Sequence, residues 1–257
     1  MKEVRKNQDH VSEAKEVWLL SSLFFAIAVL LVRFAMNAQT ALLLRIYDIE
    51  HSWLMFGIVF PNYAGGNWTV FRTLLVYGII PFIWMLAGII AARHLRRARW
   101  IHWKKRLFIT YLLFVMVIQF PAGLISGIFI FNETGFAFNT LLTNIFLRAF
   151  AALFAMAIFV IFRGFWVYLF LKTAYSRKWL EDFSDMKLYL RLVFIYPWFI
   201  ISLILIPLAV WTHFFTPAIM LAAMGFVVLP VFNAYVPLHK PRITIPYKRR
   251  ILFTEFG

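Results

Sequence analysis

The sequence contains no cysteine and few acidic residues. Its 257 residues include 26 lysines and arginines but only 11 aspartates and glutamates. The absence of cysteine excludes disulfides, zinc–thiolate sites, iron–sulfur clusters and a cysteine nucleophile. Only 14% of the residues are charged and 63% are hydrophobic, whereas about a quarter of the residues are charged in an ordinary soluble domain. With a mean hydropathy of +0.80, this composition is typical of an integral membrane protein.

Common catalytic signatures are missing as well. The chain has no Walker-type glycine loop, no G-x-S-x-G motif and no H-E-x-x-H motif. Its six histidines all lie away from the centres of the apolar segments, which does not support a haem held between two helices. We therefore expect no catalytic residues, no cofactor and no metal, and we favour a protein that is not an enzyme.

Six apolar segments alternate with polar connections. Each is about as long as the 20 residues that an α-helix needs to cross the hydrocarbon core of a bilayer. They cover residues 17–36, 73–92, 107–131, 143–171, 192–211 and 217–235. The sequence thus predicts an all-α polytopic membrane domain of six transmembrane helices over residues 17–235. Residues 1–16 form a cytoplasmic N-terminal segment, and residues 236–257 form a basic tail that its prolines keep extended.

Basic residues concentrate in alternate connections. Most of them lie in the N-terminal segment, in residues 93–106, in residues 172–191 and in the tail. The positive-inside rule therefore predicts that both termini are cytoplasmic, in a multi-pass protein of a bacterial inner membrane. The same bias explains the net charge of +15 without a nucleic-acid partner.

The connection between the first two apolar segments is the longest on the predicted outer side. Residues 41–60 are apolar but include Asp48 and Glu50, so we expect an interfacial or re-entrant segment rather than a seventh span. This long connection, followed by Trp68 and Arg72-Thr73, resembles part of the rhomboid superfamily.

Rhomboid proteases use a serine in a G-x-S-G motif on the fourth helix and a histidine on the sixth. Here the Ser126-Gly127 pair lies on the third segment and His213 lies before the sixth. The resemblance implies at most a relative without protease activity, and we do not assign the chain to that family.

Polar residues gather near the outer ends of the apolar segments. One interpretation is a solvated rim with ordinary ion pairs. The alternative is an outward-facing polar pocket in which a carboxylate pairs with an arginine inside the membrane. The candidate residues are Arg33, Asp48, Glu50, His51, Arg72, Glu133 and Arg148. Two sequons, at Asn67 and Asn132, fall on the same side, and their use would require a eukaryotic secretory compartment.

The third apolar segment contains a proline near its middle. Pro121 should kink the helix and free a backbone carbonyl, while Gly123 and Gly127 offer a face for close helix packing. We interpret this segment as a kinked packing helix. The alternative is a polar site that Gln119 and Ser126 line beside Pro121.

The basic run at residues 91–106 includes Trp100 and Trp103. Such a run suits an anionic bilayer surface, where each basic residue contributes about 1 kcal/mol. Arg163 lies near the inner end of the fourth segment and can reach the headgroups as an anchor. The candidate contacts with anionic lipid are Arg96, Arg97, Arg99, Lys104, Lys105 and Arg163. The alternative for the run is docking to an acidic partner protein.

Three functional hypotheses remain, in order of preference. The first is a non-catalytic integral subunit or accessory protein that contacts other membrane subunits in a larger assembly. The second is a small transporter or lipid-handling protein that uses the outer polar pocket. The third is an intramembrane enzyme built around Gln119, Ser126, Glu133 or His51.

Overall fold

The structure is a computed structural model. It describes residues 2–54, 57–59, 68–98, 101–126 and 134–211. Of these residues, 86% are helical. Five helices are long and apolar enough to cross a membrane, and they cover Ser12–Ile46, Val70–Arg97, Trp103–Ile125, Ile145–Leu171 and Phe183–Pro207. The prediction of a helical membrane protein is confirmed to this extent, and the sixth predicted segment, 217–235, and the tail lie outside the described residues.

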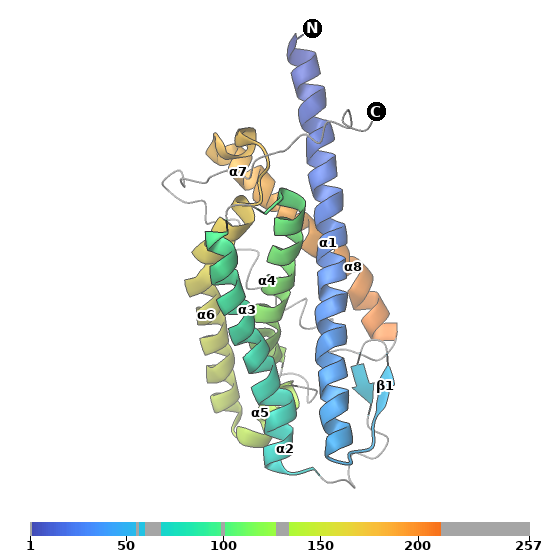
Figure 1. Cartoon of the computed structure of the whole chain (residues 1–257). Coiled ribbons are helices and arrows are strands. Elements are labelled where there is room, and N and C mark those ends of the chain that lie inside the picture. Colours follow the sequence, from blue (N-terminus) through green and yellow to red (C-terminus); the bar gives the residue numbers. More distant parts are fainter. Residues whose placement is uncertain (1, 55–56, 60–67, 99–100, 127–133, 212–257) are drawn as a thin grey trace.

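Helix α4 (Trp103–Ser126) forms the centre of the bundle. It packs against α1 (Lys2–Ile46), α3 (Ile80–Arg97) and α6 (Ile145–Leu171), as Figure 1 shows. In the most apolar part of α4 72% of the residues are buried, against 13% in α6. Helix α6 is therefore a peripheral helix, held mainly by α4.

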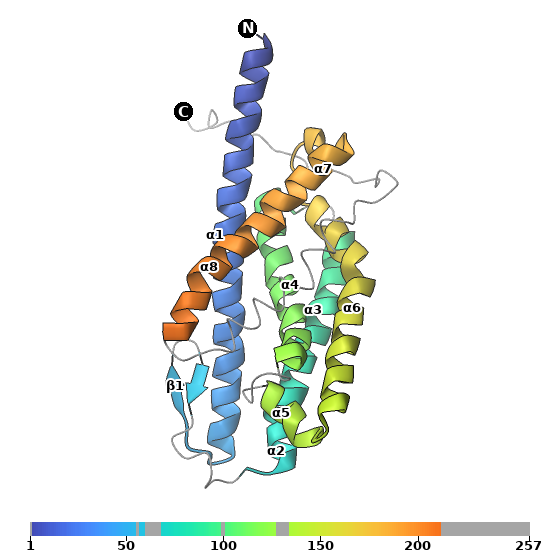
Figure 2. The same ribbon diagram turned by 180° about the vertical axis from the view of Figure 1, so that it is seen from behind.

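Helix α8 (Tyr196–Trp211) crosses α1 obliquely, away from α3 and α6 (Figure 2). The short α5 (Thr134–Leu141) packs against α4 and against α2 (Val70–Leu74), at the end of the bundle opposite the N-terminus.

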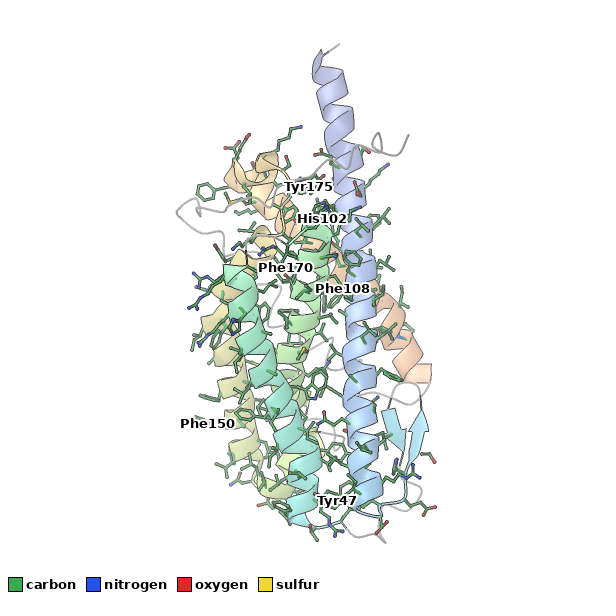
Figure 3. The ribbon with its side chains drawn as sticks, viewed as in Figure 1. Tyr47, His102, Phe108, Phe150, Phe170 and Tyr175 are labelled. Carbon is green, nitrogen blue, oxygen red and sulfur yellow. The ribbon has the colours of Figure 1, made fainter. Side chains whose placement is uncertain are left out.

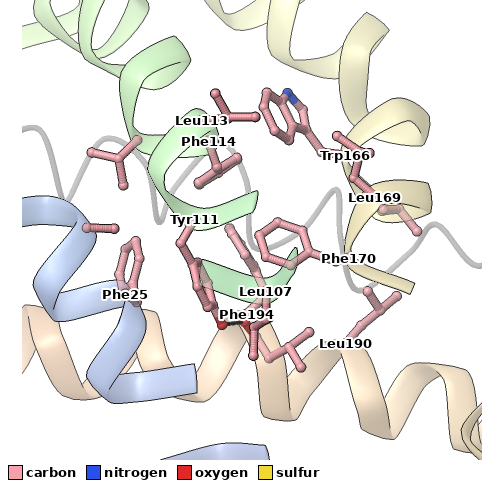
Figure 4. Packing of buried hydrophobic residues seen from close by; sticks show 14 of the residues in the cluster. Phe25, Leu107, Tyr111, Leu113, Phe114, Trp166, Leu169, Phe170, Leu190 and Phe194 are labelled. Carbon is pink, nitrogen blue, oxygen red and sulfur yellow. Dashed lines mark hydrogen bonds between the residues drawn. The ribbon is translucent and has the colours of Figure 1, made fainter. Parts of the chain in front are cut away.

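An aromatic cluster joins four helical segments in the core (Figure 4). The Phe114 ring of α4 meets the rings of Phe170 and Phe194 edge to face, with centroids 5.8 and 5.1 Å apart. Phe25 of α1 lies 5.6 Å from Tyr111. Such pairs each add about 0.5–1.5 kcal/mol beyond the burial of their area.

Two of the membrane-length helices contain a π-helical turn before a proline. Leu75–Ile79 (η1) precedes Pro81, and Arg191–Ile195 (η3) precedes Pro197, with the same two-residue offset. Proline lacks an N–H group and its ring clashes with the carbonyl four residues earlier, so a widened turn relieves the clash. The Val193 carbonyl, four residues before Pro197, accepts a hydrogen bond from the Tyr111 hydroxyl instead. This bond ties α4 to the helix that begins with α7 (Phe183–Leu190) and ends with α8.

Helix α4 continues through Pro121 to Ser126, and the kink predicted at Pro121 stays a prediction. A close contact between α3 and α4 lies at Gly88 of α3, which the sequence analysis did not single out. A Cβ atom at Gly88 would lie 2.8 Å from Val117 Cγ2 and 3.2 Å from Met116 Cβ. Gly88 thus allows α3 to approach α4 closely.

Helix α1 is longer than the predicted 17–36 at both ends. It has 45 residues, or about 67 Å at 1.5 Å per residue, and its first turns project beyond the other helices (Figure 1). It ends in a Schellman motif in which Asp48 N–H donates to Arg45 O (3.2 Å) and Ile49 N–H to Leu44 O (2.9 Å). Asp48 takes the left-handed conformation of this cap, with φ 54°.

The segment predicted to be interfacial or re-entrant is not one continuous helix, and its position relative to a membrane stays a prediction. Its first residues, 41–46, belong to α1. After the cap the chain forms an antiparallel hairpin of β1 (Ser52–Leu54) and β2 (Gly57–Val59). The charges that interrupt the apolar run at Asp48 and Glu50 mark this reversal of the chain rather than the polar face of a helix.

Candidate functional site

Helix α3 ends, α4 begins and α6 ends at one end of the bundle, where His102 and Tyr175 lie in Figure 3. We call this end the basic end, because residues 93–106 and 172–191 and the first turns of α1 bring most of the described lysines and arginines there. The opposite end holds Tyr47 (Figure 3).

Two buried cations cap the C-terminus of α3. Arg106 of α4 is only 1% exposed and donates to Leu95 O (3.3 Å) and Ala98 O (2.5 Å). Lys172, which follows α6, donates from Nζ to Arg96 O (2.5 Å). The last carbonyls of a helix lack intrahelical donors and carry the negative end of the helix dipole, so cations stabilise them. Arg106 and Lys172 therefore have structural roles that a count of basic residues does not reveal.

Aromatic rings hold other cations at the basic end. The guanidinium of Arg96 lies 5.0 Å above the centre of the Tyr168 ring, within the range of a cation–π interaction. Lys104 Nζ forms an ion pair with Glu16 of α1 (3.1 Å) and lies 5.3 Å from the centre of the Trp103 ring.

Trp103 packs in turn on Tyr175, with ring centroids 4.8 Å apart. Burial, together with the charge of Glu13, raises the pKa of Tyr175 to about 12, so its hydroxyl is neutral at physiological pH. These contacts join α1 to the connections at the basic end.

A cavity of about 740 Å³ opens between α3 and α6, with α4 as its floor. Its inner walls are apolar, and its rim at the basic end carries three arginines of α3. We call it the arginine groove. It is lined by Met85, Ile89, Arg93, Arg96, Arg97, Val117, Pro121, Phe162, Phe165 and Trp166.

The arginine groove brings together residues from two separate predictions. Arg96 and Arg97 came from the candidate lipid contacts, and Pro121 came from the kinked-helix site. Arg93 was missed, although its spacing of three and four residues from Arg96 and Arg97 places all three on one helix face. That helical spacing is the signal that could have found it.

The other predicted lipid contacts lie elsewhere. Lys104 pairs with Glu16, Lys105 is exposed, and Arg163 is half-buried on α6 outside the groove lining. Arg99 lies outside the described residues.

The remaining residues of the kinked-helix site do not line the groove. Gln119 is buried within α4, and no hydrogen-bond partner is found for its Oε1 in the part of the chain that the structure describes. Ser126 is the last residue of α4. The polar site proposed for Gln119 and Ser126 beside Pro121 stays a prediction.

A second, smaller groove of about 440 Å³ lies where α1 meets η3 and α8. Lys15 is the one cation among its described lining residues, so we call it the lysine groove. It is lined by Ala14, Lys15, Trp18, Leu192, Tyr196, Phe199 and Ile200.

The described members of the outer polar cluster support turns and helix ends. Arg148 donates from its guanidinium to Leu142 O (2.7 Å) and Thr143 O (3.0 Å), in the turn before α6. The Arg72 guanidinium lies 5.0 Å above the Tyr47 ring, and His51 Nδ1 lies 2.8 Å from Ile49 O.

The described acidic members of this cluster lie at the surface. Asp48 and Glu50 are exposed, and Arg33 is buried in α1. Glu133 lies outside the described residues. The predicted pairing of a carboxylate with Arg33, Arg72 or Arg148 stays a prediction.

Comparison of the chain with protein-family models, curated proteins and solved structures found no match in any of the three. Within the described ranges, no group of three His, Asp or Glu side chains could hold a metal ion.

Proposed function

We propose that this chain is a non-catalytic, multi-pass membrane protein that binds an anionic membrane lipid in the arginine groove. The carrying observation is the combination of an apolar cavity of about 740 Å³ with three arginines at one end. Ligand pockets commonly measure about 300–1,000 Å³, with apolar walls and a few convergent polar groups. Guanidinium groups bind phosphate through paired N–H donors, which makes arginine suited to a phospholipid headgroup.

The shape of the groove supports a lipid rather than a soluble ligand. Residues 85 to 97 of α3 span about 18 Å at 1.5 Å per residue. This length is close to half of a hydrocarbon core of about 30 Å, which is the depth of one leaflet. A lipid of that leaflet could place its phosphate at Arg97 and its acyl chain against Met85 and Ile89.

The topology is part of the same proposal. Six spans, cytoplasmic termini and a bacterial inner membrane would place the basic end in the cytoplasmic leaflet. Because the chain has no cysteine, single cysteines can report its topology. With Lys178→Cys at the basic end and Glu50→Cys at the opposite end, an impermeant maleimide should label only position 50 in intact cells. Labelling of position 178 alone would reverse the proposed orientation.

Quenching of tryptophan fluorescence tests whether a lipid chain enters the groove. Trp166 lines the arginine groove, whereas Trp179 is fully buried and absent from its lining. The emission of a single tryptophan is obtained as the difference between the wild-type protein and its Trp→Phe variant. In nanodiscs made with brominated acyl chains, the emission of Trp166 obtained in this way should be strongly quenched. The emission of Trp179 should not be quenched. An unquenched Trp166 would show that no chain enters the groove and would overturn the proposal.

A subunit of a larger membrane assembly is the second candidate, favoured by the poorly covered face of α6. Phe146, Phe150 and Ile161 are 79%, 69% and 74% exposed, and Phe150 points away from the bundle in Figure 3. This face must contact either lipid chains or a partner helix, because exposing so large an apolar area to water is unfavourable. Purification in mild detergent followed by native mass spectrometry should give a stoichiometric complex; a clean monomer would count against this candidate.

A further inference from the structure

We infer that the arginine groove selects lipids whose headgroup ends in a phosphomonoester over lipids whose phosphate is a diester. The inference rests on the proposed function, since it concerns the headgroup of the lipid that the groove binds. It follows from the number of cations at the rim, their spacing, and the surrounding contacts that position one of them.

Three positive charges lie within about one turn of α3. Arg93, Arg96 and Arg97 are separated by three and four residues, so their side chains are neighbours on one helix face. No acidic side chain is among the described residues that line the groove. A ligand with one negative charge would leave most of this charge uncompensated beside an apolar wall. A phosphomonoester carries about 1.5 to 2 negative charges at pH 7 and presents three oxygens to the guanidinium groups.

The three arginines differ from other basic residues at the same end. Arg106 and Lys172 are buried and bind the α3 carbonyls, and Lys104 pairs with Glu16. These cations already have partners in the folded chain. The rim arginines are exposed, so their N–H groups can reach a headgroup at the membrane surface.

Arg96 is also held in position before any ligand binds. Its carbonyl accepts the hydrogen bond from Lys172 Nζ (2.5 Å), and its guanidinium lies over the Tyr168 ring, 5.0 Å from the ring centroid. Stacking on a ring leaves the N–H edges of the guanidinium available for a phosphate. A donor that is already ordered loses less conformational entropy on binding, which favours affinity for a headgroup of matching charge.

The test compares three lipids with identical chains: phosphatidic acid, phosphatidylglycerol and phosphatidylcholine. Their affinities for the full chain are measured by native mass spectrometry in detergent. We expect phosphatidic acid to bind at least fivefold more tightly than phosphatidylglycerol, and phosphatidylcholine to bind most weakly. Each of the single variants Arg93→Gln, Arg96→Gln and Arg97→Gln should lower the affinity for phosphatidic acid by about fivefold.

A matched triple variant separates the site from the general charge of this face. Arg93→Gln/Arg96→Gln/Arg97→Gln should abolish the preference for phosphatidic acid. Lys105→Gln/Lys178→Gln/Lys187→Gln removes the same charge from exposed positions outside the groove and should keep it. If the arginine triple variant does not fold, the exposed single variants Arg93→Gln and Arg97→Gln give the same comparison. Loss of the preference in the lysine triple variant would overturn the inference.

Two further outcomes distinguish the headgroup from the groove. Equal affinities for phosphatidic acid and phosphatidylglycerol, both tighter than for phosphatidylcholine and with Trp166 still quenched by brominated chains, would overturn the headgroup inference and leave the proposed function in place. An unquenched Trp166 would overturn both. Glycerol 3-phosphate, which lacks chains, should not displace phosphatidic acid at equal concentration, and full displacement would mean that the site binds a soluble phosphate instead.

Discussion

The arginine groove and the lysine groove are two apolar cavities of one bundle with different rims. The arginine groove measures about 740 Å³ and the lysine groove about 440 Å³. Among the described lining residues, the arginine groove has three cations on one helix face and the lysine groove has one. A lone lysine beside apolar and aromatic side chains is an ordinary membrane-surface contact, because its ammonium can reach the headgroups of any lipid. If the arginine groove binds lipid as proposed, the number and positioning of the charges define a selective site, and apolar volume alone does not.

Each groove also contains its own tryptophan. Trp166 lines the arginine groove and Trp18 lines the lysine groove. Brominated lipids can therefore report on both grooves, through the emission of Trp166 and that of Trp18. Each emission is the difference between the wild-type protein and its variant, Trp166→Phe or Trp18→Phe. The quenching of Trp166 should depend on the headgroup of the brominated lipid, and that of Trp18 should not.

A larger side chain placed in each groove should give the largest difference between the grooves, measured as the change in affinity for phosphatidic acid. Ile89→Trp adds volume to the arginine groove, and Ile200→Trp does the same in the lysine groove. We expect Ile89→Trp to lower the affinity for phosphatidic acid at least tenfold, because the ring takes the space of the acyl chain. Ile200→Trp should leave it within twofold. Native mass spectrometry of both variants makes the comparison, and equal losses would mean that the two grooves do not differ in the way proposed.

The buried cap of α3 should have the next largest effect. Lys172→Met keeps the length of the side chain but removes the donor to Arg96 O. The bond to Arg96 O is only partly buried, so its loss should cost less than the roughly 1–3 kcal/mol of a fully buried unsatisfied carbonyl, and the thermal unfolding midpoint should fall. The affinity for phosphatidic acid should fall several-fold with the loss of order at Arg96. The exposed Lys178→Met serves as the control and should change neither quantity.

Close packing of α3 on α4 sets the position of the helix face that carries Arg93, Arg96 and Arg97. Gly88→Ala would place a Cβ atom 2.8 Å from Val117 Cγ2, while at Gly78 the nearest atoms lie 3.9 Å away. We expect Gly88→Ala to destabilise the protein by about 1–3 kcal/mol through overpacking. Gly78→Ala should be neutral or slightly stabilising. Thermal unfolding in detergent measures both changes, and a neutral Gly88→Ala would show that α3 can shift on α4 at no cost.

Much of the fold could be predicted because hydropathy and length directly reflect the thickness of a bilayer. The five described membrane-length helices overlap the first five predicted apolar segments. The ends of α1 could not be predicted from hydropathy, because residues 2–16 form a polar helix and Asp48 ends α1 through its backbone conformation. The π-helical turns before Pro81 and Pro197 depend on local backbone geometry that hydropathy does not reflect.

The candidate site was only partly predictable for a related reason. The sequence shows that residues 93–106 are basic, but not which of these cations the fold uses for itself. Arg106 and Arg97 look alike in the sequence, yet one caps α3 from inside the bundle and the other lies on the rim of a cavity. Their roles depend on how α3, α4 and α6 pack together, and this packing involves residues far apart in the chain.

The smallest predicted effect concerns Lys15, the only cation among the described residues that line the lysine groove. Lys15→Gln should change the quenching of Trp18 by less than a factor of two for any headgroup, because one exposed charge contributes only about 1 kcal/mol even at an anionic surface. The affinity for phosphatidic acid at the arginine groove should be unchanged. If Lys15→Gln instead removed a headgroup preference from Trp18, a single cation would suffice for selectivity, and three arginines on one helix face would no longer be needed to explain it.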